Sequence, residues 1–277
     1  MNLVDWLKRA RSTWFWPVLA VGYEVLVRGQ LVLERLLDAL MSPPVEAPEL
    51  DEVTAVIKTF ERPAKLRRLV KSLWRRYPKL RVIVVDDSKQ PLNLPGVETV
   101  VLPYDSGVSA GRNAGLANVA TDFVLMLDDD FIFNRHTDVM AALGKLECNS
   151  SIDILAGEVV YLPLRHTNDY SRGRLYPTAR APLVPPGTLI GGLPVLNKVP
   201  NFYLGRTAKV REVGWDDALK RIDHADFFTR AVGLLVSVQD ISFRVLHYPT
   251  YFDRRYMALK RTVEQDRVRL MEKYGEG

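Results

Sequence analysis

The stretch Phe123-Val124-Leu125-Met126-Leu127-Asp128-Asp129-Asp130 decides the fold. Five apolar residues in succession predict a buried strand, and three aspartates follow it directly. The same pattern occurs upstream, where residues 82–85 read Val-Ile-Val-Val and residues 86–88 read Asp-Asp-Ser. Residues 53–57 predict another buried strand, and residues 97–102 are a further candidate.

Two helical segments separate these strands. The first begins after Pro63 and places apolar residues at nearly ideal 3.6-residue spacing, and the second runs from about Ser109 to Val119. The order strand, helix, strand, helix, strand is typical of an α/β fold with a mostly parallel sheet flanked by helices. In such sheets ligands bind beyond the carboxyl ends of the strands, where both acidic clusters are expected.

The acidic clusters differ in how strongly they indicate a site. Asp86 and Asp87 alone are consistent with a solvated turn, whereas the three aspartates at 128–130 repel one another. A divalent cation, which prefers hard oxygen ligands, would offset that repulsion. The sequence therefore predicts a metal-assisted ligand site, with a solvated turn as the alternative.

Composition sets the broad class of the protein. The chain has 277 residues, of which 47% are hydrophobic and 26% charged, which excludes a disordered or fibrous protein. The single cysteine, Cys148, excludes an intrachain disulfide framework. Of the net charge of +5, residues 61–81 carry +8 and the remainder −3. Because this basic stripe shares a helix with an apolar face, it is interpreted as a solvated surface. We expect no nucleic-acid partner, and anionic lipid is the better candidate for contact with the stripe.

Residues 1–45 form a separate amphipathic segment. The uncharged run from Thr13 to Tyr23 is 11 residues long, and a bilayer span needs about 20. A helical pattern continues to Met41 and ends before Pro43. With tryptophans at its start and basic residues before them, it is interpreted as an interfacial membrane helix on the cytoplasmic face. The alternatives are packing on the main domain or on the second subunit of a homodimer.

Several ordered motifs resemble those of GT-A glycosyltransferases of the family-two kind, and more closely the β-1,4-N-acetylgalactosaminyltransferases that build gangliosides. The similarity covers about residues 53–247. It rests on Lys58-Thr59-Phe60, Tyr77-Pro78, Asp86-Asp87-Ser88, Gly111-Arg112-Asn113, Asp128-Asp129-Asp130-Phe131, Asn201-Phe202-Tyr203-Leu204 and His224-x-Asp226-Phe227-Phe228.

The resemblance implies a donor site for a UDP-sugar. Asp128 and Asp130 match the two acids of a DxD motif that binds Mn²⁺ or Mg²⁺ against the diphosphate, and His247 is a further candidate metal ligand. Asp87 matches the acid that reads the uracil, and Arg112 matches an arginine along the phosphates. The residues assigned to nucleotide-sugar binding are Lys58, Thr59, Arg62, Asp87, Arg112, Asp128, Asp129 and Asn201.

The resemblance also implies the catalytic residues of the second half. Asp226 stands where relatives have a glutamate that acts as general base, with Asp223 as the expected N-cap of its helix. His224 could orient the base, contact the acceptor or cap the helix. The loop 161–200, rich in proline and glycine, is either an acceptor-binding region or a plain connection.

The expected function is inverting, metal-dependent transfer of a hexose or N-acetylhexosamine, similar to GalNAc, from a UDP-sugar to a hydroxyl of a glycan or glycolipid. The alternatives are an inactive membrane-associated interaction protein on a transferase fold and a nucleotidyltransferase. The expected organisation is a helical segment at 1–45, a catalytic domain at 52–255 and a C-terminal helix at 256–277. Within the catalytic domain, 52–135 would bind nucleotide and 150–255 would bind acceptor.

Overall fold

The computed structural model describes residues 14–41, 49–259 and 263–275. Four parallel strands form the first half of one sheet, in the order β3-β2-β1-β4. They are β1 (Val53–Thr59), β2 (Arg81–Asp86), β3 (Glu98–Val101) and β4 (Phe123–Asp128). Because β1 pairs with both β2 and β4, the polar residues at the ends of these three strands meet at one edge.

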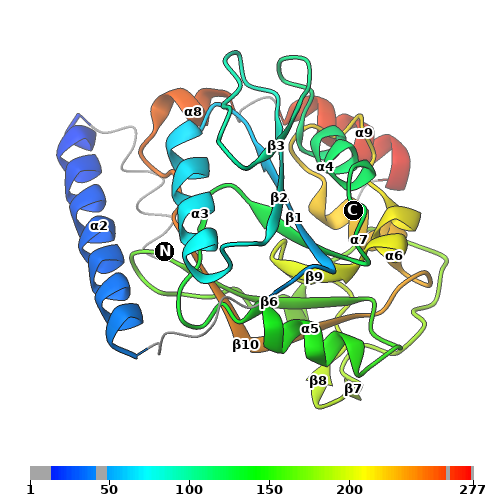
Figure 1. Cartoon of the computed structure of the whole chain (residues 1–277). Helices are drawn as coiled ribbons and strands as arrows, with labels where there is room; N and C mark the ends of the chain where they lie inside the picture. The colour runs from blue at the N-terminus through cyan, green and yellow to red at the C-terminus, as the bar shows by residue number, and fades with distance from the viewer. Residues whose placement is uncertain (1–13, 42–48, 260–262, 276–277) are drawn as a thin grey trace.

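The second half of the chain extends the same sheet. β9 (Tyr203–Arg206) lies antiparallel between β4 and β6 (Ile154–Tyr161). Beyond β6 come β10 (Ser237–His247), which is parallel to β6, and β5 (Phe131–Ile132), which is antiparallel to β10. The result is an eight-stranded mixed sheet, which confirms the predicted α/β class with flanking helices (Figure 1).

Helices cover both faces of the sheet. Alternate residues of β1 belong to opposite faces, since Ala55 and Ile57 join one hydrophobic cluster and Val56 joins the other, as the two-residue period of a strand requires. The first face is covered by α3 (Pro63–Arg76) and α5 (Val139–Glu147). The second is covered by α4 (Val108–Ala117), α6 (Thr207–Val213) and α7 (His224–Ala231).

Helix α2 (Trp16–Met41) stands at the edge of the molecule (Figure 1). One of its faces is buried in a third hydrophobic cluster, where Tyr23, Val27 and Leu31 meet the end of β10 and the segment after it. By length and composition α2 is the one helix among the described residues that could cross a membrane. Its inner face packs on the main domain, as one of the alternatives predicted.

The remaining elements are short. The loop region contains the 3₁₀ turn η1 (Tyr170–Arg172) and the hairpin strands β7 (Leu189–Ile190) and β8 (Leu193–Pro194). The C-terminal region holds two helices, α8 (Arg254–Leu259) and α9 (Glu264–Tyr274), where one was predicted. One sheet joins both halves of residues 52–255. The domain boundaries expected from the sequence stay a prediction.

Candidate active site

A cavity of about 280 Å³ opens beyond the carboxyl ends of β1, β4 and β10. Lys58 and Thr59 come from the end of β1, Asp128 from the end of β4 and His247 from the end of β10. Eight of the residues predicted from the sequence line this cavity. They are Lys58, Thr59, Arg62, Arg112, Asp128, Asp130, Asn201 and His247.

Arg62, at the N-cap position of α3, neutralises two of the three consecutive aspartates. Its guanidinium pairs with Asp129 and donates to Asp130 Oδ2 at 2.7 Å. Asp129 also accepts a hydrogen bond from the Thr59 hydroxyl at 2.7 Å and is fully buried. Burial raises the pKa of Asp129 to about 6, although the nearby guanidinium opposes the shift. Asp129 therefore holds Arg62 in place and does not itself line the cavity.

Arg112 connects α4 to both sides of the cavity. Its guanidinium pairs with Asp223 and donates to Asp128 Oδ1 at 2.8 Å. The Asp128 side chain is 36% exposed, whereas Asp223 is buried. Burial raises the pKa of the Asp223 carboxyl, and the adjacent Arg112 opposes that shift. A carboxylate with a raised pKa at the wall of a cavity is suited to proton transfer.

Asp87 lies beneath the cavity, outside its lining. Its carboxylate pairs with Lys58 and accepts a hydrogen bond from the Gly107 backbone N–H at 2.9 Å. The Lys58 side chain passes against α4 at Gly111, where an added Cβ would lie 2.2 Å from Lys58 Cδ. A glycine is required at that position if Lys58 is to reach Asp87. The role predicted for Asp87, direct contact with a base, stays a prediction, since its carboxylate contacts Lys58 and Gly107 in this structure.

Asp128, Asp130 and His247 form a donor set suited to a divalent cation. His247 Nε2 lies 3.1 Å from Asp130 Oδ1, and its buried Nδ1 has no hydrogen-bond partner among the described residues. Carboxylate oxygens and imidazole are ligands that Mn²⁺ accepts. As placed, the described part of the chain contains no cluster of three His, Cys, Asp or Glu side chains that could hold a metal ion. The three side chains therefore have the right chemistry for such a cation. In this structure, Asp128 and Asp130 are each paired with an arginine.

The two residues predicted to be catalytic lie outside the cavity. The Asp226 side chain is 1% exposed and accepts hydrogen bonds from Arg230 Nε at 2.9 Å, Lys273 Nζ at 2.6 Å and the Tyr274 hydroxyl at 2.7 Å. His224 Nε2 lies 2.6 Å from the Val199 carbonyl oxygen. That carbonyl can only accept, so Nε2 carries the proton. This geometry does not support Asp226 as the general base, because both of its oxygens serve buried structural contacts.

Sequence reasoning missed residues that the fold brings to the cavity. Asp223 was predicted to cap α7, yet its side chain makes no capping hydrogen bond and pairs with Arg112. Lys220 and Arg221, just before it, also line the cavity, as does Tyr256 from α8. Lys220, Arg221 and Asp223 lie within five residues of His224, so extending the quoted His224 motif by one helical turn toward the N-terminus would have included them. Tyr256 carries no comparable local signal.

The chain was also compared with known proteins. Residues 54–157 match the family model described as Glycosyl transferase family 2. Beta-1,4 N-acetylgalactosaminyltransferase 2 of Mus musculus is 33% identical over 220 residues, which cover 74% of this chain and 41% of that protein. Beta-1,4 N-acetylgalactosaminyltransferase 1 of Homo sapiens is 36% identical over 200 residues, which cover 66% of this chain and 36% of that protein.

This chain contains a glycosyltransferase domain of family 2. The matched segment includes nearly all of β1 and the whole of β2 and β4. It therefore contains Lys58, Thr59 and Asp128, which line the cavity at the ends of β1 and β4. The chain spans about two fifths of the length of the relatives named above. The predicted resemblance to family two and to the N-acetylgalactosaminyltransferases is confirmed.

A solved structure shares the fold of this glycosyltransferase domain. Residues 1–349 of S. aureus TarS, crystallised with UDP, align with a TM-score of 0.55 at 18% sequence identity. The alignment covers 72% of this chain and 60% of that one. The same TarS fragment was also solved with UDP-GlcNAc. The likeness confirms the GT-A fold that the sequence motifs implied.

Proposed function

We propose that this protein is a glycosyltransferase that moves a hexose or N-acetylhexosamine from a UDP-sugar to a hydroxyl of a glycan or glycolipid, with inversion at the anomeric carbon. The observation that carries the proposal is one cavity, beyond the strand ends, where Asp128, Asp130 and His247 face Arg62 and Arg112. The TarS fragment binds UDP and UDP-GlcNAc, and the curated relatives are named for transfer of N-acetylgalactosamine, which supports a donor of this class.

The donor diphosphate would lie among the two arginines and the cavity acids. Arg62 and Arg112 are each paired with aspartates here, and planar guanidinium groups are well suited to phosphate oxygens. Asp128, Asp130 and His247 would hold Mn²⁺ or Mg²⁺. A bound cation of this kind supplies Lewis acidity toward the leaving diphosphate. Lys58, Thr59 and Asn201 would form the wall around the nucleoside and sugar.

Asp223, rather than Asp226, would act as the general base. Its carboxylate lines the cavity and is oriented by Arg112, so it can receive the proton of an acceptor hydroxyl as that oxygen attacks the anomeric carbon. Inversion follows from a single in-line displacement, in which no covalent bond to the protein forms. His224 lies one residue further on, and its hydrogen bond to the Val199 carbonyl fixes the start of α7, making it a positioning residue.

We place the protein at the cytoplasmic face of a membrane, held peripherally by α2. Supporting this, α2 packs on the domain through one face and leaves large apolar residues exposed on the other. A glycolipid acceptor would then lie at the same surface. The same exposed face could instead join two copies in a homodimer.

The experiment that tests the transferase activity needs no acceptor. The purified protein is incubated with a panel of UDP-sugars and Mn²⁺, and the release of UDP by slow hydrolysis is measured. We expect one donor to be hydrolysed faster than the others and EDTA to suppress the release. If no donor releases UDP faster than it does without protein, the proposed transferase activity is contradicted. If UDP release is equal with and without EDTA, the proposed role of the metal is contradicted.

A further inference from the structure

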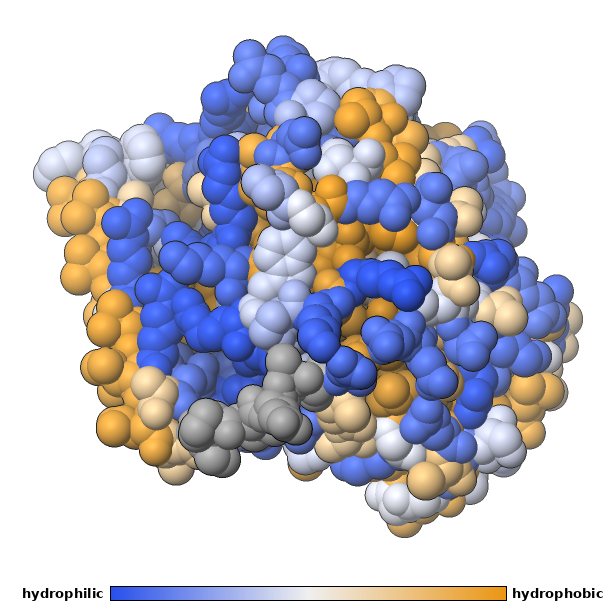
Figure 2. Space-filling view, in the orientation of Figure 1, coloured by the Kyte–Doolittle hydropathy of each residue, from blue (hydrophilic) through white to orange (hydrophobic). Residues whose placement is uncertain are grey.

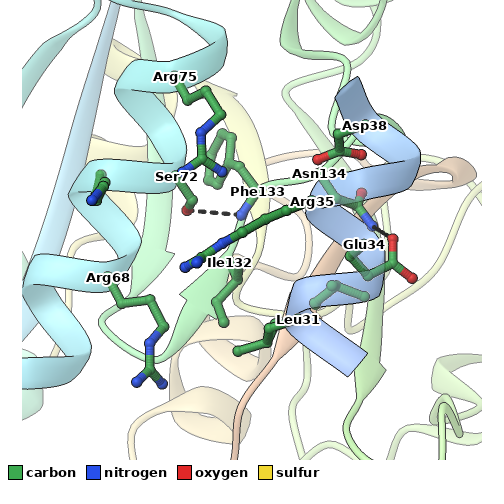
Figure 3. A pocket seen from close by; sticks show the side chains of 12 residues that line it. Leu31, Glu34, Arg35, Asp38, Arg68, Ser72, Arg75, Ile132, Phe133 and Asn134 are labelled. Atoms are coloured by element: carbon green, nitrogen blue, oxygen red, sulfur yellow. Dashed lines mark hydrogen bonds between the residues drawn. The ribbon is translucent and has the colours of Figure 1, made fainter. Parts of the chain in front are cut away.

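The groove between α2 and α3 carries basic side chains that form no ion pair with a carboxylate in the part of the chain that the structure describes. Arg68, Lys71 and Arg75 line it from α3, and Arg35 lines it from α2. None of these four side chains forms an ion pair within the described residues. In Figure 3, Arg68 and Arg75 leave α3 toward the gap between the helices, and Arg35 extends into it from α2.

The two acids in the groove do not balance these cations. Glu34 is buried and pairs with Arg135 Nη1 at 2.8 Å and Arg165 Nη1 at 2.5 Å. Asp38 lies 3.6 Å from Arg135 and accepts a hydrogen bond from that residue's backbone N–H at 2.9 Å. Both acids therefore bind arginines other than these four, and the four cations at the rim have no carboxylate partner among the described residues.

The groove is small, and its lining is partly apolar. Leu31, Ile132 and Leu246 belong to the apolar part, and the enclosed space is only about 30 Å³. A nucleotide or a free sugar phosphate could not be enclosed in that volume. A ligand that suits the groove would instead present anionic groups at the rim and stay outside the enclosed space, which describes the headgroup layer of a membrane.

The rim adjoins an exposed apolar surface on α2. Val25, Leu33, Leu36 and Leu40 are more than half exposed, on the side of the helix away from the domain. Figure 2 shows this hydrophobic column along one edge of the molecule, with hydrophilic side chains directly beside it. Contiguous apolar patches of this kind mark interaction surfaces, and a basic flank beside one is typical of helices that lie on anionic membranes.

We propose that the α2–α3 groove binds phosphate headgroups of anionic lipids while the outer face of α2 enters the acyl boundary. The inference rests on the membrane contact proposed above and adds the lipid class and the residues that select it. Each cation near a charged membrane surface strengthens binding several-fold. The four cations thus make the protein select anionic over neutral membranes.

Vesicle flotation with two matched variants tests this. The groove variant combines Arg68→Gln, Lys71→Gln and Arg75→Gln. The control variant combines Arg67→Gln, Lys79→Gln and Arg81→Gln, which removes the same charge from the same basic segment outside the groove. On phosphatidylglycerol-containing vesicles we expect the groove variant to bind about a hundredfold more weakly than wild type, from about a factor of five per cation. The control should lose less than about tenfold, and neither should change binding to neutral phosphatidylcholine vesicles.

Three outcomes would overturn the groove as a lipid site. One is equal loss in both variants, which would indicate diffuse charge attraction. Another is wild-type protein that ignores anionic lipid, and a third is a concentration-dependent dimer, seen by light scattering, that occludes α2. Because Arg68 also lies 4.6 Å over the Tyr248 ring, a second variant with Arg35→Gln in place of Arg68→Gln keeps that contact. Hydrolysis of UDP-sugar without vesicles is measured on every variant, so that a failed transferase and a failed lipid site give separate results.

Discussion

Asp223, just before α7, and Asp226, in the first turn of α7, differ in what their carboxylates contact. Asp223 faces the cavity beside Arg112, whereas Asp226 is enclosed by Arg230, Lys273 and Tyr274. A general base contributes typically about 10²–10⁴ in rate. We therefore expect Asp223→Asn to lower kcat at least about a hundredfold with little change in UDP affinity.

Asp226→Asn is the matched control for that variant. It leaves Lys273 and Arg230 without their buried partner, so it should lower the free energy of unfolding by about 3 kcal/mol. At temperatures where the variant stays folded, kcat should remain within about tenfold of wild type. Kinetics and urea unfolding of both variants decide the matter. A near-normal kcat for Asp223→Asn would move the base elsewhere.

Asp130 carries a prediction for metal and donor. It lines the cavity beside His247, and Arg62 shares its charge. UDP should bind more tightly with Mn²⁺ than with chelator, because the cation offsets the repulsion between diphosphate and carboxylates. Asp130→Asn keeps the side-chain shape and should remove most of that difference in calorimetry. Equal UDP affinity with and without metal in the wild-type protein would refute this role.

His224 makes stability depend on pH. Burial lowers its pKa from the usual 6.5 to about 4, because the charged imidazole loses hydration there, and the nearby Arg112 and Lys198 lower it further. Between about pH 4 and pH 6.5 the unfolded chain binds the additional proton, so stability should fall as the pH falls through that window. His224→Gln can still donate to the Val199 carbonyl and does not titrate. Urea unfolding at several pH values should show a shallower loss for this variant, and an unchanged slope would contradict it.

At the scale of elements, α9 holds the segment that carries Asp223, the proposed base. The Asp266 carboxylate accepts hydrogen bonds from three consecutive backbone N–H groups, those of Lys220 at 3.1 Å, Arg221 at 2.6 Å and Ile222 at 2.8 Å. Lys273 and Tyr274 hold Asp226 from the same helix. The C-terminal helix therefore orders both ends of the turn into α7.

Asp266→Ala should loosen that segment. Hydrogen bonds to a charged group contribute about 1.5–3 kcal/mol each, and some of that is recovered by water, so we expect the free energy of unfolding to fall by about 3 kcal/mol. Because Lys220 and Arg221 line the cavity, KM for the donor should rise as well. Glu264→Ala, at an exposed position of α9, is the control and should change neither quantity. A stability loss without any change in KM would separate α9 from the site.

The strands that the sequence predicted are those whose signal is local. β2 and β4 contain unbroken apolar runs, and β1 is apolar from Val53 to Ile57 except at Thr54, because both faces of these parallel strands are buried. β9 and β5 were not predicted, since they are four and two residues long and depend on antiparallel partners far along the chain. The contacts of Asp226 could not be predicted from the sequence either, because its partner Lys273 lies 47 residues away along the chain.

In the candidate site too, residues with a local sequence signal were predicted, and residues that depend on distant packing were not. Asp128 and Asp130 stand at the end of a strand that the sequence marks clearly, and the structure places both in the cavity. Asp223 and Asp226 are only three residues apart in a motif, and periodicity alone cannot say which of them faces a cavity formed by other elements. Motif matching thus located the start of α7, while only the packing shows that Asp223 lines the cavity and that Asp226 does not.

At the scale of the whole molecule, α2 is both a structural element and a surface. Tyr23 donates a hydrogen bond to the Pro249 carbonyl oxygen at 2.7 Å, and Glu24 pairs with the Tyr248 hydroxyl. The Tyr248 backbone N–H in turn donates to the Asp130 carbonyl oxygen at 2.9 Å. The docking of α2 is therefore linked to the segment that carries the candidate metal ligands.

Leu31 and Leu36 separate the two roles of α2, because they are the same residue type on opposite faces. Leu31 is 6% exposed and Leu36 is 55% exposed. Leu31→Ala removes buried side-chain volume and should lower the free energy of unfolding by about 2–5 kcal/mol. Leu36→Ala should stay within about 0.5 kcal/mol of wild type while weakening flotation with anionic vesicles. If Leu36→Ala destabilised the protein as much as Leu31→Ala, the outer face would be covered by protein, and a membrane would not be its partner.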